Sequence, residues 1–434
     1  MRKSRVYLGV CSDYRVEAIQ EVIREGMNQL ALTKSISGRI VIKPNLVMAH
    51  PKVATDGYTR AEVIGGILAN LNLTKDSGNC VKIVEKSGLG ITTGSAFRWA
   101  GYRALARQYP VKLVAMEESR HKRVVLEKGK VHPHVTVAKD LADRDFLIFA
   151  PKLKTNVLSH AFSGALKLNI GSVDSKERLY HHHFDLPAKI VDLMEAANPD
   201  LIVTDGIRLS HGGNQMTQHG TYLGVIILSD NAVAHDIVCA KMLNLDPHKI
   251  EHIQEAIDRG YGPASFDDIE IIGDYPIAKA QAIASKLDFG FMPVHEFPSN
   301  FEIHSGSPYC TGGCHGIFLD WLHMIRDRSP GELKRFPRVP VLIGKVVQKI
   351  RAKRVLLIGD CAAASPQIQS RHLIRIPGCP PTHKGIVLRM MYRLFLFAPL
   401  VCPSLIFDSF ILYPAKKIKG WFMNLRFKPE PVED

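Results

Sequence analysis

The chain has 434 residues, a formal net charge of +14, and 46% hydrophobic and 23% charged residues. This composition is typical of a globular protein with a large core and excludes a disordered or low-complexity chain. The length favours two domains and a tail. The positive charge favours acidic partners or anionic surfaces, but Lys and Arg are scattered and no nucleic-acid-binding module is present. We therefore expect no nucleic-acid partner.

The N-terminal segment has a basic start but no apolar secretory core, and it passes directly into the strand-like run Val6–Val10. We therefore expect a cytoplasmic protein. In a reducing compartment, a spaced set among the eight cysteines is better suited to metal binding or redox chemistry than to disulfides.

Residues 1–275 alternate apolar runs with helical patterns, which predicts a large α/β domain with a mostly parallel sheet. The expected strands are Val6–Val10, Arg39–Ile42, Cys80–Val84, Val111–Val114, Phe146–Ala150, Leu201–Thr204 and Val225–Ser229. The expected helices are Ala18–Leu30, Arg60–Leu71, Ala96–Gln108 and Ala188–Ala196.

Polar side chains follow several of these strands, where functional groups of parallel sheets gather. Lys43, Lys152, Lys154 and Lys167 are expected to converge on one crevice and to bind a carboxylate or phosphate. Crowded lysines can also act as bases or nucleophiles, so these four are the candidate catalytic residues. The candidate substrate-binding residues are Asn45, Thr155, Asn169, His182, Asp205 and Asp236. The alternatives are ordinary surface lysines and, for Asp236, a helix cap.

The run His181–His183 offers a second possibility in the same domain, a metal held by His and Asp side chains. Adjacent residues cannot all face one ion, and the spacing matches no known ligand pattern. Acid–base use of one histidine is an equally open hypothesis.

A linker at residues 276–299 is expected to lead into a smaller α/β unit at residues 300–384. Its expected elements are strand Phe301–His304, helix Ile317–Ile325, strand Val339–Ile343, a basic helix, and strands Val355–Ile358 and Leu373–Ile376. Cys310, Cys314, Cys361 and Cys379 each follow closely on a strand. The four thiols should therefore meet at one edge of the sheet.

Four thiolates can hold a 4Fe-4S cluster or a zinc ion. One C-x3-C pair, two single cysteines on other strands and a final Cys-Pro favour the cluster, because structural zinc usually uses paired knuckles. Four buried free cysteines are the remaining alternative. The other cysteines, Cys11, Cys80, Cys239 and Cys402, are interpreted as core or tail residues.

The order C-x3-C, G-x-C-A and P-G-C-P-P resembles the flavodoxin-like cluster module of nickel–iron hydrogenase small subunits and of the small iron–sulfur subunit of respiratory complex I. In those families such cysteines hold a 4Fe-4S cluster. The first pair departs from their pattern, which is C-x2-C or an adjacent pair.

Five segments of residues 1–275 carry a second resemblance, namely Ile42–Leu46, Ala150–Asn156, Gly164–Gly171, Asp205–Gly206 and Ser229–Asp236. Through them the large domain resembles the domain-of-unknown-function 362 family, whose members often carry an iron–sulfur domain. The resemblance implies a fold and a pocket, while the family's chemistry is not settled.

The tail, residues 385–434, contains the apolar run Leu394–Leu412, which only just reaches the length of a membrane span and is broken by two prolines and Asp408. Packing on the body or on a partner is the favoured interpretation. The alternative is peripheral membrane contact through residues 385–421, since basic residues and Trp421 flank the run.

The leading hypothesis is an iron–sulfur electron-transfer protein or oxidoreductase, acting on a small anionic substrate or on the cofactor of a redox partner protein. The first alternative is a non-redox, metal-dependent enzyme acting on a carboxylate, with a structural four-cysteine site. The second is a membrane-peripheral assembly protein.

Overall fold

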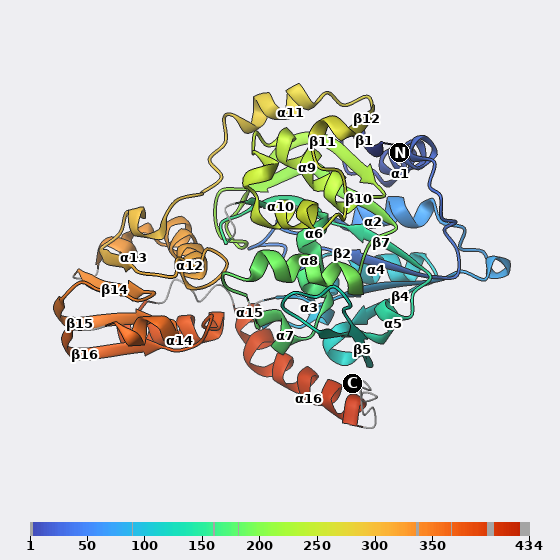
Figure 1. Cartoon of the computed structure of the whole chain (residues 1–434). Helices are drawn as coiled ribbons and strands as arrows, with labels where there is room; N and C mark the ends of the chain where they lie inside the picture. The colour runs from blue at the N-terminus through green and yellow to red at the C-terminus, as the bar shows by residue number, and fades with distance from the viewer. Residues whose placement is uncertain are drawn as a thin grey trace.

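The computed structural model describes residues 3–88, 90–158, 161–180, 182–335, 338–365, 367–396 and 403–425. The N-terminal part builds one mixed, mostly parallel sheet in the order β12-β1-β11-β10-β7-β2-β3-β4, with β8 and β9 paired beside β10 (Figure 1). Its strands are β1 (Ser4–Val10), β2 (Arg39–Pro44), β3 (Cys80–Glu85), β4 (Val111–Ala115), β7 (Phe146–Ala150), β8 (Lys152–Asn156), β9 (Ala161–Ser163), β10 (Leu201–His211), β11 (His219–Ser229) and β12 (Ile269–Gly273). This confirms the predicted α/β class.

Each face of this sheet is covered by helices, because successive strand residues point to opposite sides. Ile40 and Ile42 pack with one set of helices, whereas Val41 between them packs with the other. The first set is α1 (Val16–Leu30), α2 (Ala61–Ala69), α3 (Thr93–Trp99) and α4 (Tyr102–Gln108). The second set is α6 (Ala165–Leu168), α8 (Leu186–Ala196), α9 (Ala232–Met242) and α10 (Glu251–Asp258).

Three local predictions were wrong in the large domain. The single helix expected over Ala96–Gln108 is two helices, separated at Gly101, whose φ is +84°. β10 does not end before Asp205-Gly206 but continues to His211, paired antiparallel with β11. β8 begins directly after Pro151, although no strand was predicted there. In the last two cases, long-range strand pairing overrode local turn signals.

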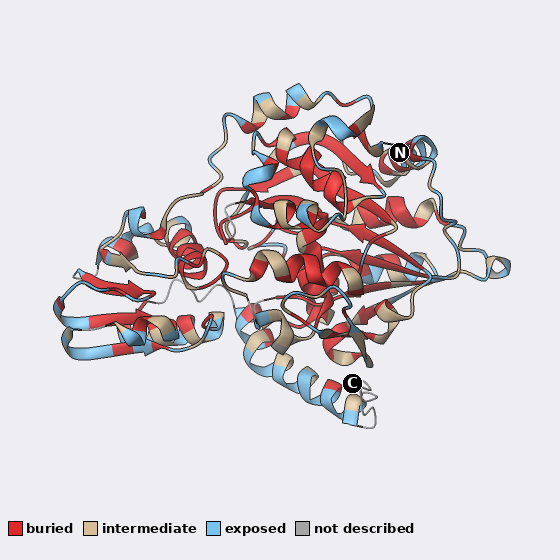
Figure 2. Cartoon of the chain, in the orientation of Figure 1, coloured by how far each residue is buried: buried red, intermediate tan, exposed pale blue. Residues whose placement is uncertain are grey.

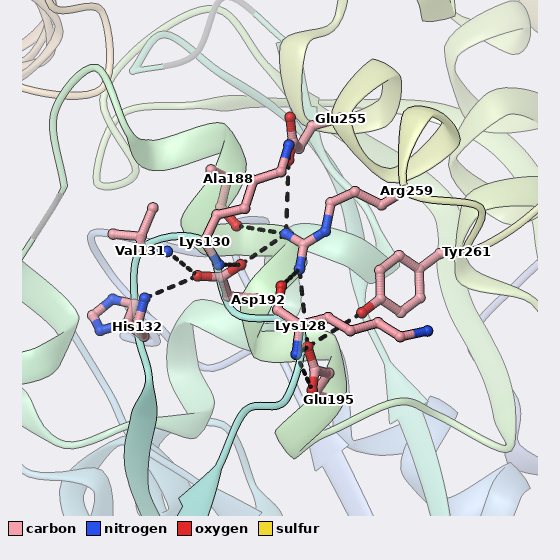
Figure 3. Close-up of polar contacts among 10 residues, drawn as sticks. All are labelled: Lys128, Lys130, Val131, His132, Ala188, Asp192, Glu195, Glu255, Arg259 and Tyr261. Atoms are coloured by element: carbon pink, nitrogen blue, oxygen red, sulfur yellow. Dashed lines mark hydrogen bonds and ion pairs between the residues drawn. The ribbon is translucent and has the colours of Figure 1, made fainter.

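A buried polar network holds the hairpin of β5 (His121–Val125) and β6 (His134–Ala138) against α8 and α10 (Figure 3). Asp192 of α8 accepts hydrogen bonds from the backbone N–H groups of Lys130, Val131 and His132 at 2.9, 2.7 and 3.0 Å. The Arg259 guanidinium donates to the same carboxylate at 2.7 Å. Both oxygens of a fully buried carboxylate are therefore paired, which stabilises the fold.

The second unit contains a four-stranded, all-parallel sheet whose strands follow chain order, β13-β14-β15-β16. It shares the parallel α/β character of the expected flavodoxin-like module, but its strand order differs from that of flavodoxin. The predicted basic helix is absent, because residues from Ile350 onward belong to β15. The elements of the second unit are β13 (Phe301–Ser305), α12 (Cys314–Arg328), α13 (Pro330–Arg335), β14 (Val339–Ile343), β15 (Ile350–Ile358), β16 (Ile368–Ile376) and α14 (His383–Leu394).

The two units share a hydrophobic core. Met48, Leu158 and Met216 of the large domain pack in one cluster with Ile317 and Leu322 of α12. The segment expected as a linker contains α11 (Ile277–Ala284), which packs on α9. The second unit is thus packed against the first through apolar side chains.

The C-terminal helices are α15 (Pro403–Phe407), a π-helical turn η8 (Asp408–Leu412) and α16 (Tyr413–Leu425). They lie along the large domain, where Asp408 accepts hydrogen bonds from the Thr92 backbone and hydroxyl at 2.6 and 2.9 Å. No helix in the described part of the chain is long and apolar enough to cross a bilayer. α14, by contrast, packs in the core of the second unit through Ile386 and Met390, so the expected tail boundary at residue 385 falls inside this helix.

Candidate functional site

The four cysteines of the second unit gather at the carboxyl end of its parallel sheet. Cys310 follows β13, Cys361 follows β15, Cys379 follows β16, and Cys314 is the first residue of α12. None of them forms a disulfide. Burial, followed by the neighbouring Cys310, Cys379 and Cys361 thiols, raises the pKa of Cys314 to about 12. The other three thiols all contribute to this shift, so they lie close to Cys314.

The loops that carry the cysteines are fastened to one another. The carboxylate of Asp360 accepts a hydrogen bond from the Gly378 N–H at 2.8 Å, and the Asp360 N–H donates to the Gly378 carbonyl at 3.2 Å. Gly359 has a φ of +84°, and a Cβ at this position would lie 2.4 Å from the Cys314 sulfur. Only glycine therefore allows β15 to end so close to this thiol.

The spacing of the thiols bears on which group they could hold. In the described part of the chain, no three His, Cys, Asp or Glu side chains are arranged to hold a single metal ion. A tetrahedral zinc ion needs its four ligands around one atom. A four-iron cluster places each thiolate on a different iron, so its ligands stand further apart. The cysteine loops therefore bring the four thiols near one another without an arrangement of three ligands around one ion among the described residues.

A cavity of about 710 Å³ lies where the large domain, the second unit and the C-terminal helices meet. Its polar wall carries Lys43, Asn45, Glu85, Lys154, Lys167, Arg178 and His182. Its apolar wall carries Met48, Ile91, Leu158, Ile317, Trp321, Val387, Leu405, Ile406 and Phe410. The cavity is therefore lined by both cationic and apolar side chains.

Three of the four predicted lysines line this cavity, in different electrostatic states. Lys43 donates to Glu85 at 3.0 Å, and both side chains are buried. Burial lowers the pKa of Lys154 to about 8. Burial, reinforced by the neighbouring Lys154, lowers the pKa of Lys167 to about 7. Lys167 therefore exchanges a proton near neutral pH, as a general acid or base must.

The fourth lysine lies elsewhere. Lys152 donates to Asp205 at 2.9 Å and to the Tyr14 hydroxyl at 3.1 Å, and none of these three residues lines the cavity. The pairing of β8 with β10 is irregular, which separates Lys152 from Lys154 although they are two residues apart on one strand. Lys152 and Asp205 therefore form a buried ion pair within the sheet.

The other predicted substrate-binding residues divide in the same way. Asn45 and His182 line the cavity. Asp236 accepts hydrogen bonds from the Ala165 and Leu166 N–H groups at 2.7 and 3.1 Å, so it caps α6 instead of facing the cavity. Its position agrees with the helix-cap alternative, although the helix it caps is not its own.

Thr155 and Asn169 are buried next in sequence to cavity residues but do not line the cavity. The Thr155 hydroxyl and both polar atoms of the Asn169 amide have no hydrogen-bond partner within the described ranges. His181 lies outside those ranges, whereas the Nδ1 atom of His182 lies 2.7 Å from the Gly312 carbonyl oxygen.

The cavity and the cysteines are joined by α12. Cys314, Ile317 and Trp321 follow the i, i+3, i+7 spacing of one helix face, and the last two line the cavity. Trp321 lies about 10 Å along the helix axis from Cys314, at 1.5 Å per residue. His182 makes a second link, because it lines the cavity and contacts the cysteine loop at Gly312.

Sequence reasoning missed several cavity residues, namely Arg178, Trp321, His383 and Tyr413. Arg178 donates to the Lys86 and Ser87 carbonyls at 3.1 Å. The Trp321 N–H and the His383 Nδ1 atom are buried without a hydrogen-bond partner among the residues that the structure describes. No local signal marks these residues, since tertiary packing alone brings them to the cavity. Glu85 could have been recognised as a cavity residue from the sequence, because it lies at the carboxyl end of a predicted strand.

Among the remaining cysteines, Cys11 and Cys239 are buried, as expected. Cys80 is exposed at the start of β3, so its assignment to the core was wrong. Cys402 lies outside the described residues.

Comparison with known proteins finds a family match over the region that carries the cavity lysines. Residues 40–241 match the model of DUF362, a domain of unknown function. The matched region runs from β2 into α9, and it contains Lys43, Lys154 and Lys167 but none of the four clustered cysteines. The DUF362 region therefore supplies the cationic wall of the cavity.

Three individual proteins that the chain resembles share 25% identity or less with it. A protein of Synechocystis sp. named thylakoid-associated protein is 25% identical over 233 residues, which cover 52% of this chain and 70% of the relative. The lactate racemase apoprotein from Thermoanaerobacterium thermosaccharolyticum has a TM-score of 0.35 at 11% identity, covering 78% of this chain and 69% of that one. A protein from Thermotoga maritima has a TM-score of 0.34 at 12% identity, covering 77% and 72%. Structural likeness at this level does not extend to function.

Proposed function

We propose that this protein is a 4Fe-4S redox protein that exchanges electrons with an anionic ligand held in the cavity. The observation that carries the proposal is the shared face of α12, which begins at a clustered cysteine and continues into the cavity wall at Ile317 and Trp321. A binding site and a redox centre on one short helix face can exchange electrons without a large conformational change.

The cysteine site supports a cluster over the alternatives. A bound cluster would supply or accept one electron at a time, with Cys310, Cys314, Cys361 and Cys379 as its ligands. Burial raises the pKa of Cys310 to about 11 and that of Cys314 to about 12, so these two thiols are protonated when no metal is bound and would release protons on cluster assembly. The alternative of a His/Asp metal site in the large domain has no matching group among the described residues.

The two walls of the cavity indicate the class of ligand. Lys154, Lys167 and Arg178 suit an anionic group such as a carboxylate. The apolar wall suits a hydrocarbon or aromatic portion of the same molecule. Lys167 can donate a proton to a ligand that gains an electron and can take a proton back from water, since its pKa lies near neutrality.

The cluster is tested by anaerobic purification of the full chain, followed by iron and sulfide analysis and by absorbance and electron paramagnetic resonance spectroscopy. We expect about four irons and four sulfides per chain. Cys361→Ser should lose most of the iron, whereas Cys80→Ser, an exposed cysteine on β3, should retain it. Protein that binds zinc without sulfide would contradict the proposal and favour a structural four-cysteine site.

The ligand class is tested separately with decanoate as a probe. Decanoate should bind more tightly than acetate, which lacks the hydrocarbon chain, and more tightly than decanol, which lacks the charge. Equal binding of decanoate and decanol would contradict the cationic wall as the recognition element. This result does not depend on whether a cluster is present.

A further inference from the structure

We propose that the outer face of the C-terminal helices docks on an anionic lipid membrane. Along α15, η8 and α16 the large apolar side chains point to solvent. Phe407 is 54% exposed, Ile411 57%, Ile418 57% and Phe422 61%. Figure 2 shows α16 as a largely exposed helix at the edge of the molecule.

These residues form a single stripe. The positions of Phe407, Ile411, Ile418, Phe422 and Leu425 rise by four, seven, four and three residues, which is the repeat of one face of a helix. Trp421 stands beside this stripe and is 60% exposed. The outer face of these helices is therefore continuously apolar.

The opposite face is polar and is attached to the large domain. Asp408 accepts from Thr92, and Lys416 and Lys419 both donate to Glu118, at 3.0 and 3.1 Å. The Asn424 amide donates to the Ser119 carbonyl at 3.1 Å and accepts from the His121 N–H at 3.0 Å. Gly420 lies so close that a Cβ there would meet the Glu117 carbonyl oxygen at 1.9 Å.

This arrangement inverts the usual pattern of a surface helix, which buries its apolar face and exposes its polar face. Since exposed apolar side chains gain no burial energy in water, a contiguous apolar stripe of this kind marks an interaction surface. The polar contacts fix the helix with that stripe outward, ready to meet an apolar partner.

The charge distribution identifies the partner as a bilayer with anionic headgroups. In residues 403–425 the only acidic residue is Asp408, and it is buried on the inner face. Lys417 is exposed beside the stripe, and the Lys384 ammonium lies 4.5 Å from the ring centroid of Phe410. Aromatic side chains with flanking lysines are the composition of helices that lie in the membrane interface.

Docking would also bring the cavity to the bilayer. Ile406 and Phe410 line the cavity and are themselves 36% and 40% exposed. The apolar wall of the cavity thus includes exposed side chains that are next in sequence to Phe407 and Ile411 of the docking face.

Co-sedimentation of the full chain with vesicles tests this proposal. Binding should be strong to phosphatidylcholine vesicles containing phosphatidylglycerol and should weaken with pure phosphatidylcholine or added salt. The double variant Ile418→Ser/Phe422→Ser should bind at least about tenfold more weakly, because two large apolar side chains lose their burial in lipid. Val347→Ser/Leu373→Ser, which removes exposed apolar side chains of the second unit, is the matched control and should bind like the wild type.

A spectroscopic measurement covers the case in which a variant folds poorly. The chain has three tryptophans, and Trp421 is the one in the docking face. Fluorescence of the wild type should shift to the blue on vesicle addition, and Trp421→Phe should lose this shift. The proposal is overturned if vesicles do not bind, or if the Ser double variant binds them as the wild type does. Dimers of the wild type that the double variant does not form, without vesicle binding, would instead assign the face to a second copy of the chain.

Discussion

Two buried polar regions differ in how completely their groups are paired, namely the Asp192 network of the large domain and the cavity between the large domain and the second unit. Around Asp192 each carboxylate oxygen accepts hydrogen bonds from two donors, and the Arg259 guanidinium neutralises the charge (Figure 3). Around the cavity, the Trp321 N–H and the His383 Nδ1 atom are buried without partners in the described part of the chain. Lys154 and Lys167, whose pKa values are lowered by burial, line the same cavity.

The difference separates groups that stabilise the fold from groups that are kept for a ligand. A buried polar group without a partner costs about 1–3 kcal/mol, so native structures keep few of them. Trp321 and His383 line one cavity beside lysines with a lowered pKa, and this combination is typical of a binding or catalytic site. The same contrast predicts which substitutions will affect stability and which will affect binding.

The largest expected effect is on stability. Asp192→Ala leaves Arg259 without its buried partner and removes the acceptor of three backbone N–H groups. We expect the free energy of unfolding to fall by about 3–5 kcal/mol, measured by urea denaturation. Asp145→Ala, which breaks the exposed pair with Arg39, is the control and should cost far less. Equal losses in the two variants would contradict the structural role of the network.

Lys154→Met should weaken ligand binding and leave stability intact, the opposite of the effect expected for Asp192→Ala. It removes an ammonium group from the cavity wall, and decanoate affinity measured by calorimetry should fall by about tenfold to a hundredfold. Stability should stay the same or rise, because an apolar side chain replaces a buried charge. A variant that binds decanoate normally but unfolds easily would place Lys154 among the structural groups.

The pH dependence of decanoate binding tests Lys167. Its pKa of about 7 means that the ammonium form, which attracts the carboxylate, disappears as pH rises through about 7. Affinity should therefore fall with rising pH by up to about tenfold per unit, and Lys167→Met should flatten the profile. Without ligand the sign is reversed, since the unfolded chain keeps this proton up to the ordinary value of 10.5 and the folded chain does not. Stability should then rise with pH between these two values.

The smallest expected effect comes from comparing two buried donors, the Trp321 N–H and the Tyr102 hydroxyl, of which only the second has a described hydrogen-bond partner. Trp321→Phe keeps the apolar wall but removes the N–H, so a ligand that uses this donor should bind about three- to tenfold more weakly, with stability nearly unchanged. Tyr102→Phe removes a hydroxyl that donates to the Thr59 carbonyl at 2.9 Å and should lower the free energy of unfolding by about 1 kcal/mol. Ligand binding should not respond to Tyr102→Phe.

The sequence was informative where function depends on strand ends. Lys43 lies at the carboxyl end of β2 in the large sheet, and the clustered cysteines lie at the carboxyl end of the second sheet, as expected for functional groups of parallel strands. That reasoning extended the same role to Asp205, and there it was wrong. An Asp-Gly pair usually marks a turn, but pairing of β10 with β11 carries the strand through it.

Other features depend on contacts between distant residues. Asp236 caps a helix that begins 71 residues earlier in the chain. Trp321 and His383 reach the cavity only because the second unit packs on the large domain, although sequence analysis placed the crevice and the cysteines in separate domains. The inverted tail helix also depends on its polar contacts with residues 92–121, which no local pattern reveals.

Electron paramagnetic resonance of the reduced, anaerobically purified protein, recorded with and without decanoate, tests most directly whether the cysteine site and the cavity act together. We expect an iron–sulfur signal. In the wild type, decanoate binding should change the shape of this signal or the reduction potential of the cluster, and in Lys154→Met the same decanoate concentration should change neither. A signal that is absent, or one that stays unchanged when the cavity is saturated with decanoate, would contradict the proposal.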